Sequence, residues 1–537
     1  MSSHTGNSLP ELISGLLEAA AYPHPAAAPR LIETHISWVI LAGDYAYKIK
    51  KPLNLGFLDF STLERRRHFC DEELRLNRRL APDTYLARVA ITGSPQSPFI
   101  GGAGPAIEWA VQMRAFPADA TLDREADIGV EQIDAIADRI AAFHADIAVA
   151  PMTSADGAPE TVSQPVQDNF RQLARLLPLH ADLPFKTLLD RLQDWSTSEA
   201  NRLTPFFSAR KAGGQIRECH GDLHLGNIAW VAGQPIIFDA LEFNPALRNI
   251  DLISEIAFLT MDLQHRNRPD LAWRFLDRYL EQSRDAQAAI DGLRGLRFYQ
   301  VYRAMVRAKV AAFQTSESAR PDDFHDCLTY LRLAETLSRN RRPALLLMHG
   351  VSGSGKTWLS QHLLEQLGAI RLRSDVIRKR LFGLKPLQGS AAIPGGIYTR
   401  EAGERTLRTL LDQARMLLEA GFLVIIDATF IQRAWRAPFQ ALAEALAVDW
   451  RIVALEAPAD VLQARITERQ RSGADASEAG LEVLASQLAH LEAFTATEQA
   501  HVSAFNIGCK AMDVVAQLRE TLDFQHSSDQ HNANAAE

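Results

Sequence analysis

The segment HGDLHLGN, residues 220–227, combines an acid and an amide at a spacing that suits phosphoryl transfer. Asp222 could accept the proton of an attacking hydroxyl, and Asn227, five positions later, could hold Mg²⁺. Asp239 follows the apolar run PIIF and lies 12 residues beyond Asn227, which is the length of a strand, a turn and a second strand. This geometry would bring both metal ligands to one place.

A second segment, GVSGSGKT at residues 350–357, satisfies the phosphate-loop pattern G-x-x-x-x-G-K-[ST]. An apolar strand pattern runs into it and a helix pattern runs out, so backbone N–H groups could surround phosphates at a helix N-terminus. The lysine would reach the β- and γ-phosphates, and the threonine hydroxyl would bind Mg²⁺. The residues expected to form this site are Gly350, Gly353, Gly355, Lys356 and Thr357.

Two acidic residues follow later strand patterns in the same half. Asp427 ends the apolar run in LVIIDATF, where it could hold the water shell of the metal or simply cap a strand-to-helix turn. Asp375 in LRSDVIRKR follows the second strand, above the crevice where such sheets bind ligands. We expect Asp375 to be the base for an acceptor hydroxyl.

Residues 344–510 resemble the small P-loop kinases, including gluconate-kinase-like, polynucleotide-kinase-like and zeta-toxin-like proteins and domains described as AAA-type ATP-binding domains. The resemblance implies that Arg378 contacts the substrate. It also implies that Arg465, Arg469 and Arg471 are lid arginines that neutralise the transferred phosphoryl group. Arg465 and Arg469 are four residues apart and share a helix face, which could equally be a solvated basic face.

Residues 30–330 resemble the aminoglycoside phosphotransferase and choline-kinase group of the protein-kinase-like fold, on the motifs HGDLHLGN, PIIFDALEFN and AAFHA. The resemblance implies a lysine that holds the α- and β-phosphates. YAYK supplies Lys48, with Lys50 on the same strand face. Glu73 is the expected ion-pair partner, with Glu72 as the alternative. Asp251 would support the catalytic loop or cap the next helix.

This half also departs from the protein kinases. The loop before Lys48 contains only Gly43, and FDALEF differs from D-F-G. Protein kinase activity is therefore not expected. We find no acidic C-terminal cluster that would receive a polycationic antibiotic, so the resemblance to aminoglycoside phosphotransferases indicates the fold rather than the substrate.

The elements that must position these residues follow from hydrophobic periodicity. In the first half, strand patterns at 35–41, 45–50 and 108–116 precede helical patterns, which predicts a small sheet followed by a mainly helical part. The helical patterns cover 131–147, 166–196 and 251–340.

In the second half strands and helices alternate, which predicts a doubly wound parallel sheet. Strands are expected at 344–349, 369–374, 422–427 and 450–456, and helices at 356–367, 376–382, 399–419, 434–446 and 458–471. The fold class is therefore α/β and α+β, with a two-lobed kinase-like domain over 1–340, a P-loop domain over 341–525 and a disordered tail over 526–537.

The composition is that of a globular protein, with 47% apolar and 23% charged residues. No apolar run is long enough for a membrane span, and the N-terminus lacks the basic start of a secretory signal, so a cytoplasmic location is expected. Four widely spaced cysteines predict reduced, structural thiols. The net charge of −8 argues against a nucleic-acid partner, although a local basic groove remains open for the second half.

The fused arrangement resembles a bacterial group with an aminoglycoside-phosphotransferase-like half followed by a P-loop half. It implies a bifunctional ATP-dependent phosphotransferase that uses ATP and Mg²⁺ in both halves and transfers the γ-phosphoryl group to a hydroxyl of a small molecule. Two alternatives stay open: a second half that phosphorylates the 5′-hydroxyl of nucleic acid, and a first half that binds nucleotide only as a regulator. The sequence leaves the acceptors and the oligomeric state undetermined.

Overall fold

A computed structural model describes residues 9–56, 58–176, 183–316, 324–339, 343–472, 476–506 and 508–522. The expected tail over 526–537 and the expected boundary between 340 and 341 lie outside the described residues. Contacts divide the chain into two compact units. The first contains Met1–Pro165 and Phe207–Leu259, and the second contains Val166–Phe206 and Thr260–Glu537. The helices that follow residue 260 thus group with the P-loop half, although the domain boundary near 340 stays a prediction.

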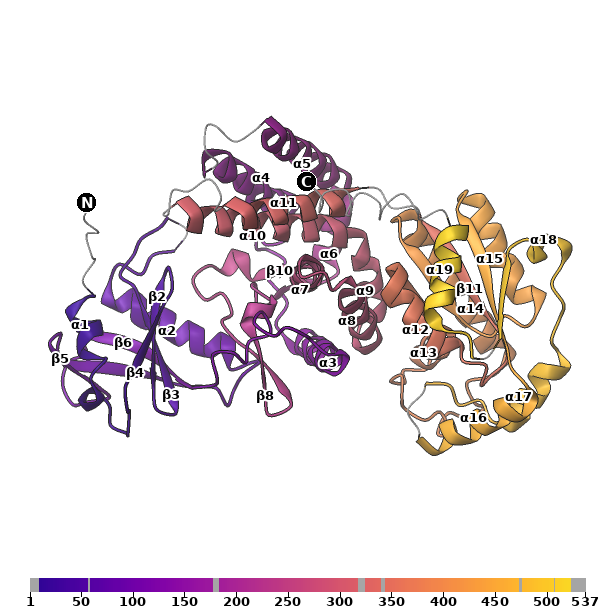
Figure 1. Ribbon diagram of the computed structural model, residues 1–537, viewed down its shortest axis with the longest axis horizontal. Helices are drawn as coiled ribbons and strands as arrows, with labels where there is room; N and C mark the ends of the chain where they lie inside the picture. The colour runs from indigo at the N-terminus through magenta and orange to yellow at the C-terminus, as the bar shows by residue number, and fades with distance from the viewer. Residues whose placement is uncertain are drawn as a thin grey trace. The chain divides into compact units, whose positions relative to one another are not determined.

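The first unit is built on a six-stranded antiparallel sheet with the strand order β1-β2-β3-β6-β4-β5 (Figure 1). The predicted strands at 35–41, 45–50 and 108–116 correspond to β2, β3 and β6. Lys48 on β3 lies between Val39 of β2 and Val111 of β6. The strands are β1 Arg30–Glu33, β2 Ser37–Ala42, β3 Tyr45–Lys50, β4 Tyr85–Ser94, β5 Ser97–Ile100 and β6 Glu108–Arg114.

Helix α2 packs on this sheet against β4 and β6. It begins after Thr62, whose hydroxyl accepts the N–H of Arg65 as an N-cap. Short antiparallel pairs, β7 with β10 and β8 with β9, carry the loops of the first motif. These elements are α1 Glu11–Gly15, α2 Leu63–Asn77, α3 Val130–Asp146, β7 Ile216–Glu218, β8 Ile228–Val231, β9 Gln234–Ile237 and β10 Asn249–Asp251.

The second unit contains a helical layer in which α10 packs along α11 and α5 contacts both. The predicted helical pattern over 166–196 corresponds to two helices, and the pattern over 251–340 to several. Helices α4 and α7 begin in the first unit and end in the second, whereas α6 begins in the second unit and ends in the first. The helices are α4 Pro159–Leu176, α5 Leu183–Arg202, α6 Thr204–Ala212, α7 Leu252–His265, α8 Pro269–Gln282, α9 Ala286–Gly292, α10 Leu296–Ser316 and α11 His325–Ser338.

The rest of the second unit is a five-stranded parallel sheet with the strand order β12-β13-β11-β14-β15. All residues of β11 and β13 are buried, as expected for strands covered on both faces. The strands are β11 Ala344–His349, β12 Ala369–Arg373, β13 Leu423–Asp427, β14 Asp449–Glu456 and β15 Val502–Asn506.

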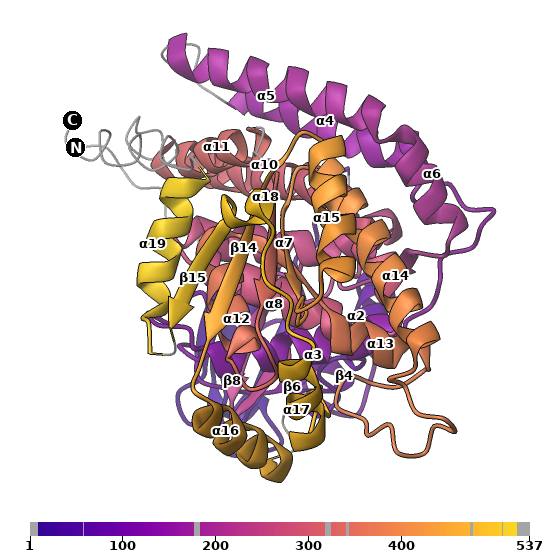
Figure 2. The ribbon, with the colours of Figure 1, turned by 90° about the vertical axis from the view of Figure 1, so that its right-hand side faces the viewer.

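Helices cover both faces of this sheet, with α12 against α19 on one face and α14 against α15 on the other (Figure 2). Helix α8, from earlier in the chain, packs against α12 and β12. The helices are α12 Lys356–Leu367, α13 Ser374–Leu381, α14 Arg400–Glu419, α15 Arg433–Ala445, α16 Ala459–Ser472, α17 Leu481–Ala489, α18 Ala496–Gln499 and α19 Ala511–Thr521.

The predicted fold class is confirmed. The chain combines a part with an antiparallel sheet followed by helices and a P-loop part with a doubly wound parallel sheet. No helix among the described residues combines the length and the apolar character that crossing a membrane requires.

Candidate functional site

The loop of the second motif connects β11 to α12 and adopts backbone angles that favour glycine. Gly350 has φ 143°, and a Cβ atom there would lie 2.8 Å from the carbonyl oxygen of Leu455. Gly355 has φ 96° and is the N-cap of α12. Side chains would therefore be strained at these positions. The loop thus curls directly into a helix N-terminus, as the sequence predicts.

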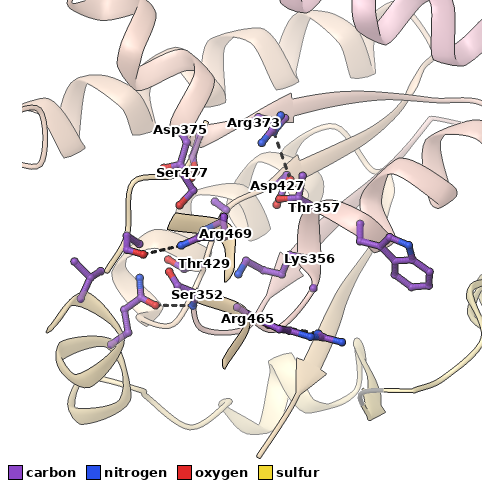
Figure 3. Close-up of a pocket in the computed structure, with 18 of the residues that line it drawn as sticks. Ser352, Lys356, Thr357, Arg373, Asp375, Asp427, Thr429, Arg465, Arg469 and Ser477 are labelled. Atoms are coloured by element: carbon purple, nitrogen blue, oxygen red, sulfur yellow. Dashed lines mark hydrogen bonds and ion pairs between the residues drawn. The ribbon is translucent and has the colours of Figure 1, made fainter. Parts of the chain in front are cut away.

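This loop forms the wall of a cavity of about 330 Å³ (Figure 3). Most of the residues predicted for the second site line it. Two of them, Gly350 where β11 enters the loop and Arg471 on α16, are not part of the lining. The predicted residues in the lining are Gly353, Gly355, Lys356, Thr357, Asp375, Arg378, Asp427, Arg465 and Arg469.

Oxygen atoms suited to a divalent cation meet at one end of this cavity. Asp427 ends β13, is buried and lies next to Thr357 in Figure 3. One of its carboxylate oxygens accepts a hydrogen bond from the Ser360 hydroxyl at 3.3 Å. Carboxylate and hydroxyl oxygens are the hard ligands that Mg²⁺ prefers, so the donor set fits this metal.

An acid and an aromatic ring contact an arginine in the lining of the same cavity. Asp375 lies in the first turn of α13, and its carboxylate is 3.1 Å from the guanidinium of Arg378. The same guanidinium lies 4.9 Å from the ring centre of Tyr398. All three residues line the cavity. The expected base and the expected substrate contact are therefore neighbours.

The arginines of α16 differ in their surroundings. Arg465 donates to the carbonyl oxygen of Gly353 at 3.4 Å, and Arg469 donates to the carbonyl oxygen of Ala479 at 2.7 Å. The side chain of Arg471 is 75% exposed and lies 3.7 Å from Glu468. Arg471 is not part of the lining of the cavity, and its role as a lid arginine stays a prediction.

Two polar contacts within the protein stabilise the phosphate loop. The Lys356 ammonium donates to the carbonyl oxygen of Val351 at 2.9 Å. The Ser352 N–H donates to the side-chain oxygen of Gln487 at 2.7 Å, and Gln487 comes from α17. Both donors line the cavity and would face a phosphate. Sequence reasoning missed Gln487, because a single glutamine on a short helix has no local signature.

In the first motif the acid and the amide are in direct contact. The Asn227 amide nitrogen donates to the carbonyl oxygen of Asp222 at 2.9 Å and to its carboxylate at 3.0 Å. This leaves the amide oxygen of Asn227 as the atom that can coordinate a metal. The Asp222 side chain is 32% exposed, so a hydroxyl acceptor could reach it. His224, which sequence reasoning missed, lies 3.4 Å from this carboxylate.

A buried glutamate holds the backbone of this loop. Glu255 on α7 accepts the N–H groups of His220 at 2.6 Å and Gly221 at 2.9 Å. Burial lowers the pKa of His220, which favours its neutral form, and its Nε2–H donates to the carbonyl oxygen of Phe238 at 2.8 Å. Glu255 was not predicted. It shows that support for the loop comes from the following helix.

Asp251, predicted either to support the loop or to cap a helix, is well placed for the cap. It accepts the N–H of Ile253 at 2.9 Å at the start of α7. It also binds the guanidinium of Arg210 through both oxygens, at 2.7 and 2.8 Å. Cys219, just before the loop, is fully buried, in agreement with a structural thiol.

Asp239 follows β9 with φ 63°, a left-handed conformation that is rare for a residue with a side chain. Its N–H donates to the Tyr85 hydroxyl at 3.1 Å, and its carboxylate pairs with the ammonium of Lys48. The Asp239 side chain is 44% exposed. The backbone therefore turns this carboxylate toward the expected phosphate-binding lysine and toward solvent.

Two lysines share one glutamate beneath this site. Glu73 lies 2.9 Å from Lys48 and 2.7 Å from Lys50. Burial alone would raise the pKa of Glu73, but the two ammonium groups lower it to about 2. Lys48 extends to Asp239, whereas the fully buried Lys50 extends to Glu242. Of the two candidates, Lys48 is thus the one that reaches the expected metal ligand. Sequence reasoning missed Glu242.

The family model described as an AAA domain matches residues 345–494. The match covers the phosphate loop, both acids of the cavity and the arginines of α16. It confirms the recognition of a P-loop domain in the second half.

Several solved structures resemble one part of the chain each. A choline/ethanolamine kinase family protein from Mesorhizobium loti is 13% identical and covers 61% of this chain and 94% of its own, with a TM-score of 0.37. A gluconokinase from Sinorhizobium meliloti is 22% identical and covers 34% of this chain and 98% of its own, with a TM-score of 0.25.

Curated relatives cover both halves. The uncharacterized proteins Rv2004c of Mycobacterium tuberculosis and Mb2027c of Mycobacterium bovis are each 32% identical over 455 residues, which is 83% of this chain and 87% of theirs. A match of this extent must include residues from both predicted domains. The chain therefore belongs to the same protein family as these mycobacterial proteins.

Proposed function

We propose that the chain is a bifunctional ATP-dependent phosphotransferase, in which each half binds ATP with Mg²⁺ and transfers the γ-phosphoryl group to a hydroxyl of a small molecule. The observation that supports this most is the cavity of the second half. There the phosphate loop, an acid suited to bind a metal ion, a second acid and two arginines line one cavity.

In the second half, the loop amides and Lys356 would hold the β- and γ-phosphates, and Thr357 and Asp427 would hold Mg²⁺. The acceptor hydroxyl would attack the γ-phosphorus as the bond to the bridging oxygen of ADP breaks. Asp375 would take the hydroxyl proton. Arg465 and Arg469 would neutralise charge on the transferred group.

In the first half, Asp222 would orient the acceptor hydroxyl and take its proton. Asn227 and Asp239 would hold Mg²⁺, for which their oxygen donors are suited. Lys48 would hold the α- and β-phosphates and Glu73 would orient Lys48. The present pair between Lys48 and Asp239 would have to open when nucleotide binds. In each half Mg²⁺, when bound, would neutralise charge on the phosphates and orient them.

The test is phosphoryl transfer from [γ-³²P]ATP to a panel of sugars, other hydroxylated metabolites, aminoglycosides and 5′-hydroxyl oligonucleotides. It uses the full-length chain, Asp222→Ala and Lys356→Ala. We expect each variant to lose one labelled product and retain the other. Equilibrium titration should give two nucleotides per wild-type chain. A single nucleotide at saturation, or no labelled product at all, would contradict the proposal.

The panel also separates the alternatives. Labelling of the oligonucleotide that Lys356→Ala abolishes would make the second half a polynucleotide 5′-hydroxyl kinase. If Asp222→Ala changed no rate while the first half still bound nucleotide, that half would be a regulator.

A further inference from the structure

A buried ion pair connects α8 to the sheet of the P-loop part, within one compact unit. Arg371 on β12 donates through Nε and Nη2 to the two oxygens of Asp277 on α8, at 3.2 and 2.6 Å. The two side chains are 3% and 8% exposed. A buried charge pair of this kind fixes both partners, because neither can regain water without separating.

The remaining donors of Arg371 reach the helix that carries the phosphate loop. Nη1 donates to the Ser360 hydroxyl at 3.2 Å and to the carbonyl oxygen of Thr357 at 3.3 Å. The Ser360 hydroxyl in turn donates to Asp427 at 3.3 Å. Arg371 is thus two hydrogen bonds away from the proposed metal ligand, and it also contacts the backbone of the other ligand.

A second ion pair between β12 and α8 involves Arg373, two residues beyond Arg371 on the same strand. Arg373 donates to the carboxylate of Glu281, one turn beyond Asp277 on α8, at 3.1 Å. Its Nε lies 3.9 Å from Asp427, as the dashed line in Figure 3 shows. The nearby arginines lower the pKa of Glu281, so it is a carboxylate at neutral pH despite its burial.

These contacts set the charge around the proposed metal ligand. Arg371 and Arg373 lie within one or two contacts of Asp427. Each also forms an ion pair with an acid of α8, which compensates its charge. Without these acids, the guanidinium groups would compete with a divalent cation for the Asp427 oxygens and repel it.

We propose that Asp277 and Glu281 are positioning residues of the P-loop cavity, which hold Arg371 and Arg373 back so that Asp427 can accept a divalent cation. This inference rests on the proposed function of that cavity. It extends the site to a helix that lies some 75 residues upstream of the phosphate loop in the chain.

The test measures how ATP binding depends on Mg²⁺ in the full-length chain. Binding of a fluorescent ATP analogue is followed at increasing Mg²⁺ and also in EDTA, and only the component that Lys356→Ala removes is analysed. The variants are Asp277→Asn with Glu281→Gln, and Asp277→Glu as the charge-retaining form. Asp270→Asn in the first turn of α8 and Arg274→Gln, which breaks the pair with Glu365 at 2.9 Å, are controls.

We expect the double variant to need about tenfold more Mg²⁺ for half-maximal binding, because two uncompensated cations lie near the metal ligand. Binding in EDTA should stay unchanged or become tighter. Asp277→Glu and both controls should behave like the wild type.

An unchanged Mg²⁺ dependence would overturn the inference. A parallel loss of binding with and without Mg²⁺ would also overturn it, since it would indicate a merely structural role. If the wild type showed no component that depends on Lys356, the proposed function of the cavity would fail, and this inference with it.

Discussion

The residues beneath the first site form an alternating series of buried charges. Glu242, Lys50, Glu73, Lys48 and Asp239 contact one another in that order. Only the Asp239 end of the series is substantially exposed. The lysine that would meet a phosphate is therefore oriented by carboxylates deeper in the protein, and Glu242 at the buried end should matter for folding.

We predict that Glu242→Ala lowers the free energy of unfolding of the first unit by about 3 kcal/mol, because it removes one partner of a fully buried ion pair. Glu33→Ala is the control. It breaks the pair between Glu33 and Lys51, in which the glutamate is half exposed, and should change stability by less than about 1 kcal/mol. Urea-induced unfolding of both variants measures the difference, and equal effects would refute the argument.

A buried histidine next to the phosphate loop makes stability depend on pH. His349 contacts the ring of Phe494, and its Nε2 has no hydrogen-bond partner within the described part of the chain. Burial, with Arg436 and Lys356 nearby, lowers the pKa of His349 from 6.5 to about 4. The unfolded chain thus binds this proton more tightly, and stability falls as the pH drops from 6.5 toward 4.

We predict that the free energy of unfolding of the P-loop part is about 2 kcal/mol lower at pH 5 than at pH 7.5, because His349 becomes protonated in the unfolded chain. His349→Gln should lack this part of the decrease. Thermal unfolding of both proteins at several pH values gives the comparison. Identical pH profiles would show that His349 does not contribute.

At the scale of elements, the contact of α8 with α12 constrains a glycine. Gly368 ends α12 with φ 73°, and a Cβ atom there would lie 2.8 Å from Nε1 of Trp273 on α8. Gly383, after α13, has nearly the same φ of 72°, but no atom of the residues that the structure describes lies within 4 Å of its Cβ position. Substitutions at these two glycines therefore distinguish the cost of backbone strain from the cost of a clash with α8.

We predict that Gly368→Ala lowers the free energy of unfolding by about 3 kcal/mol, of which about 1 kcal/mol is left-handed backbone strain and the rest is the clash with Trp273. Gly383→Ala should show the strain alone. Chemical denaturation of both variants measures this. Equal losses would mean that α8 yields to the extra methyl group without cost.

Elements with strong local signals were predictable from the sequence. Strands β3 and β11 and helix α12 have the predicted bounds, because alternation, a buried apolar run and a glycine cap define them locally. Elements β15 and α17–α19 were not predicted. Short helices and edge strands of this kind depend on packing for their stability, and packing has no periodic signature.

The same distinction holds for the sites. Residues within a motif, such as Asp222 or Lys356, could be proposed as site residues from their spacing. Glu255 and Gln487 could not, because each reaches its loop from a separate element through one long-range hydrogen bond. Roles that rest on a motif can be proposed from sequence, whereas the groups that hold the motif in place require the structure.

At the scale of the whole molecule, α8 lies before the expected domain boundary but belongs to the same compact unit as the parallel sheet. Fragments that begin at residue 266 and at residue 343, both ending at 522, test what it contributes. We predict that the shorter fragment unfolds at a temperature roughly 5 to 10 °C lower, because Arg371 loses its buried partner.

Thermal unfolding with and without Mg²⁺ and ATP measures this difference. Asp277→Asn in the longer fragment should move its unfolding temperature toward that of the shorter one. Equal temperatures for the two fragments would show that the sheet stands without α8.

The acids on α8 also bear on how such a gene can evolve. A coding sequence for residues 343–522 alone would yield the parallel sheet with Arg371 and Arg373 but without the acids of α8 that pair with them. Recombination at the junction of the halves would therefore be harmful even if the two halves acted independently, and selection should keep both halves in one reading frame.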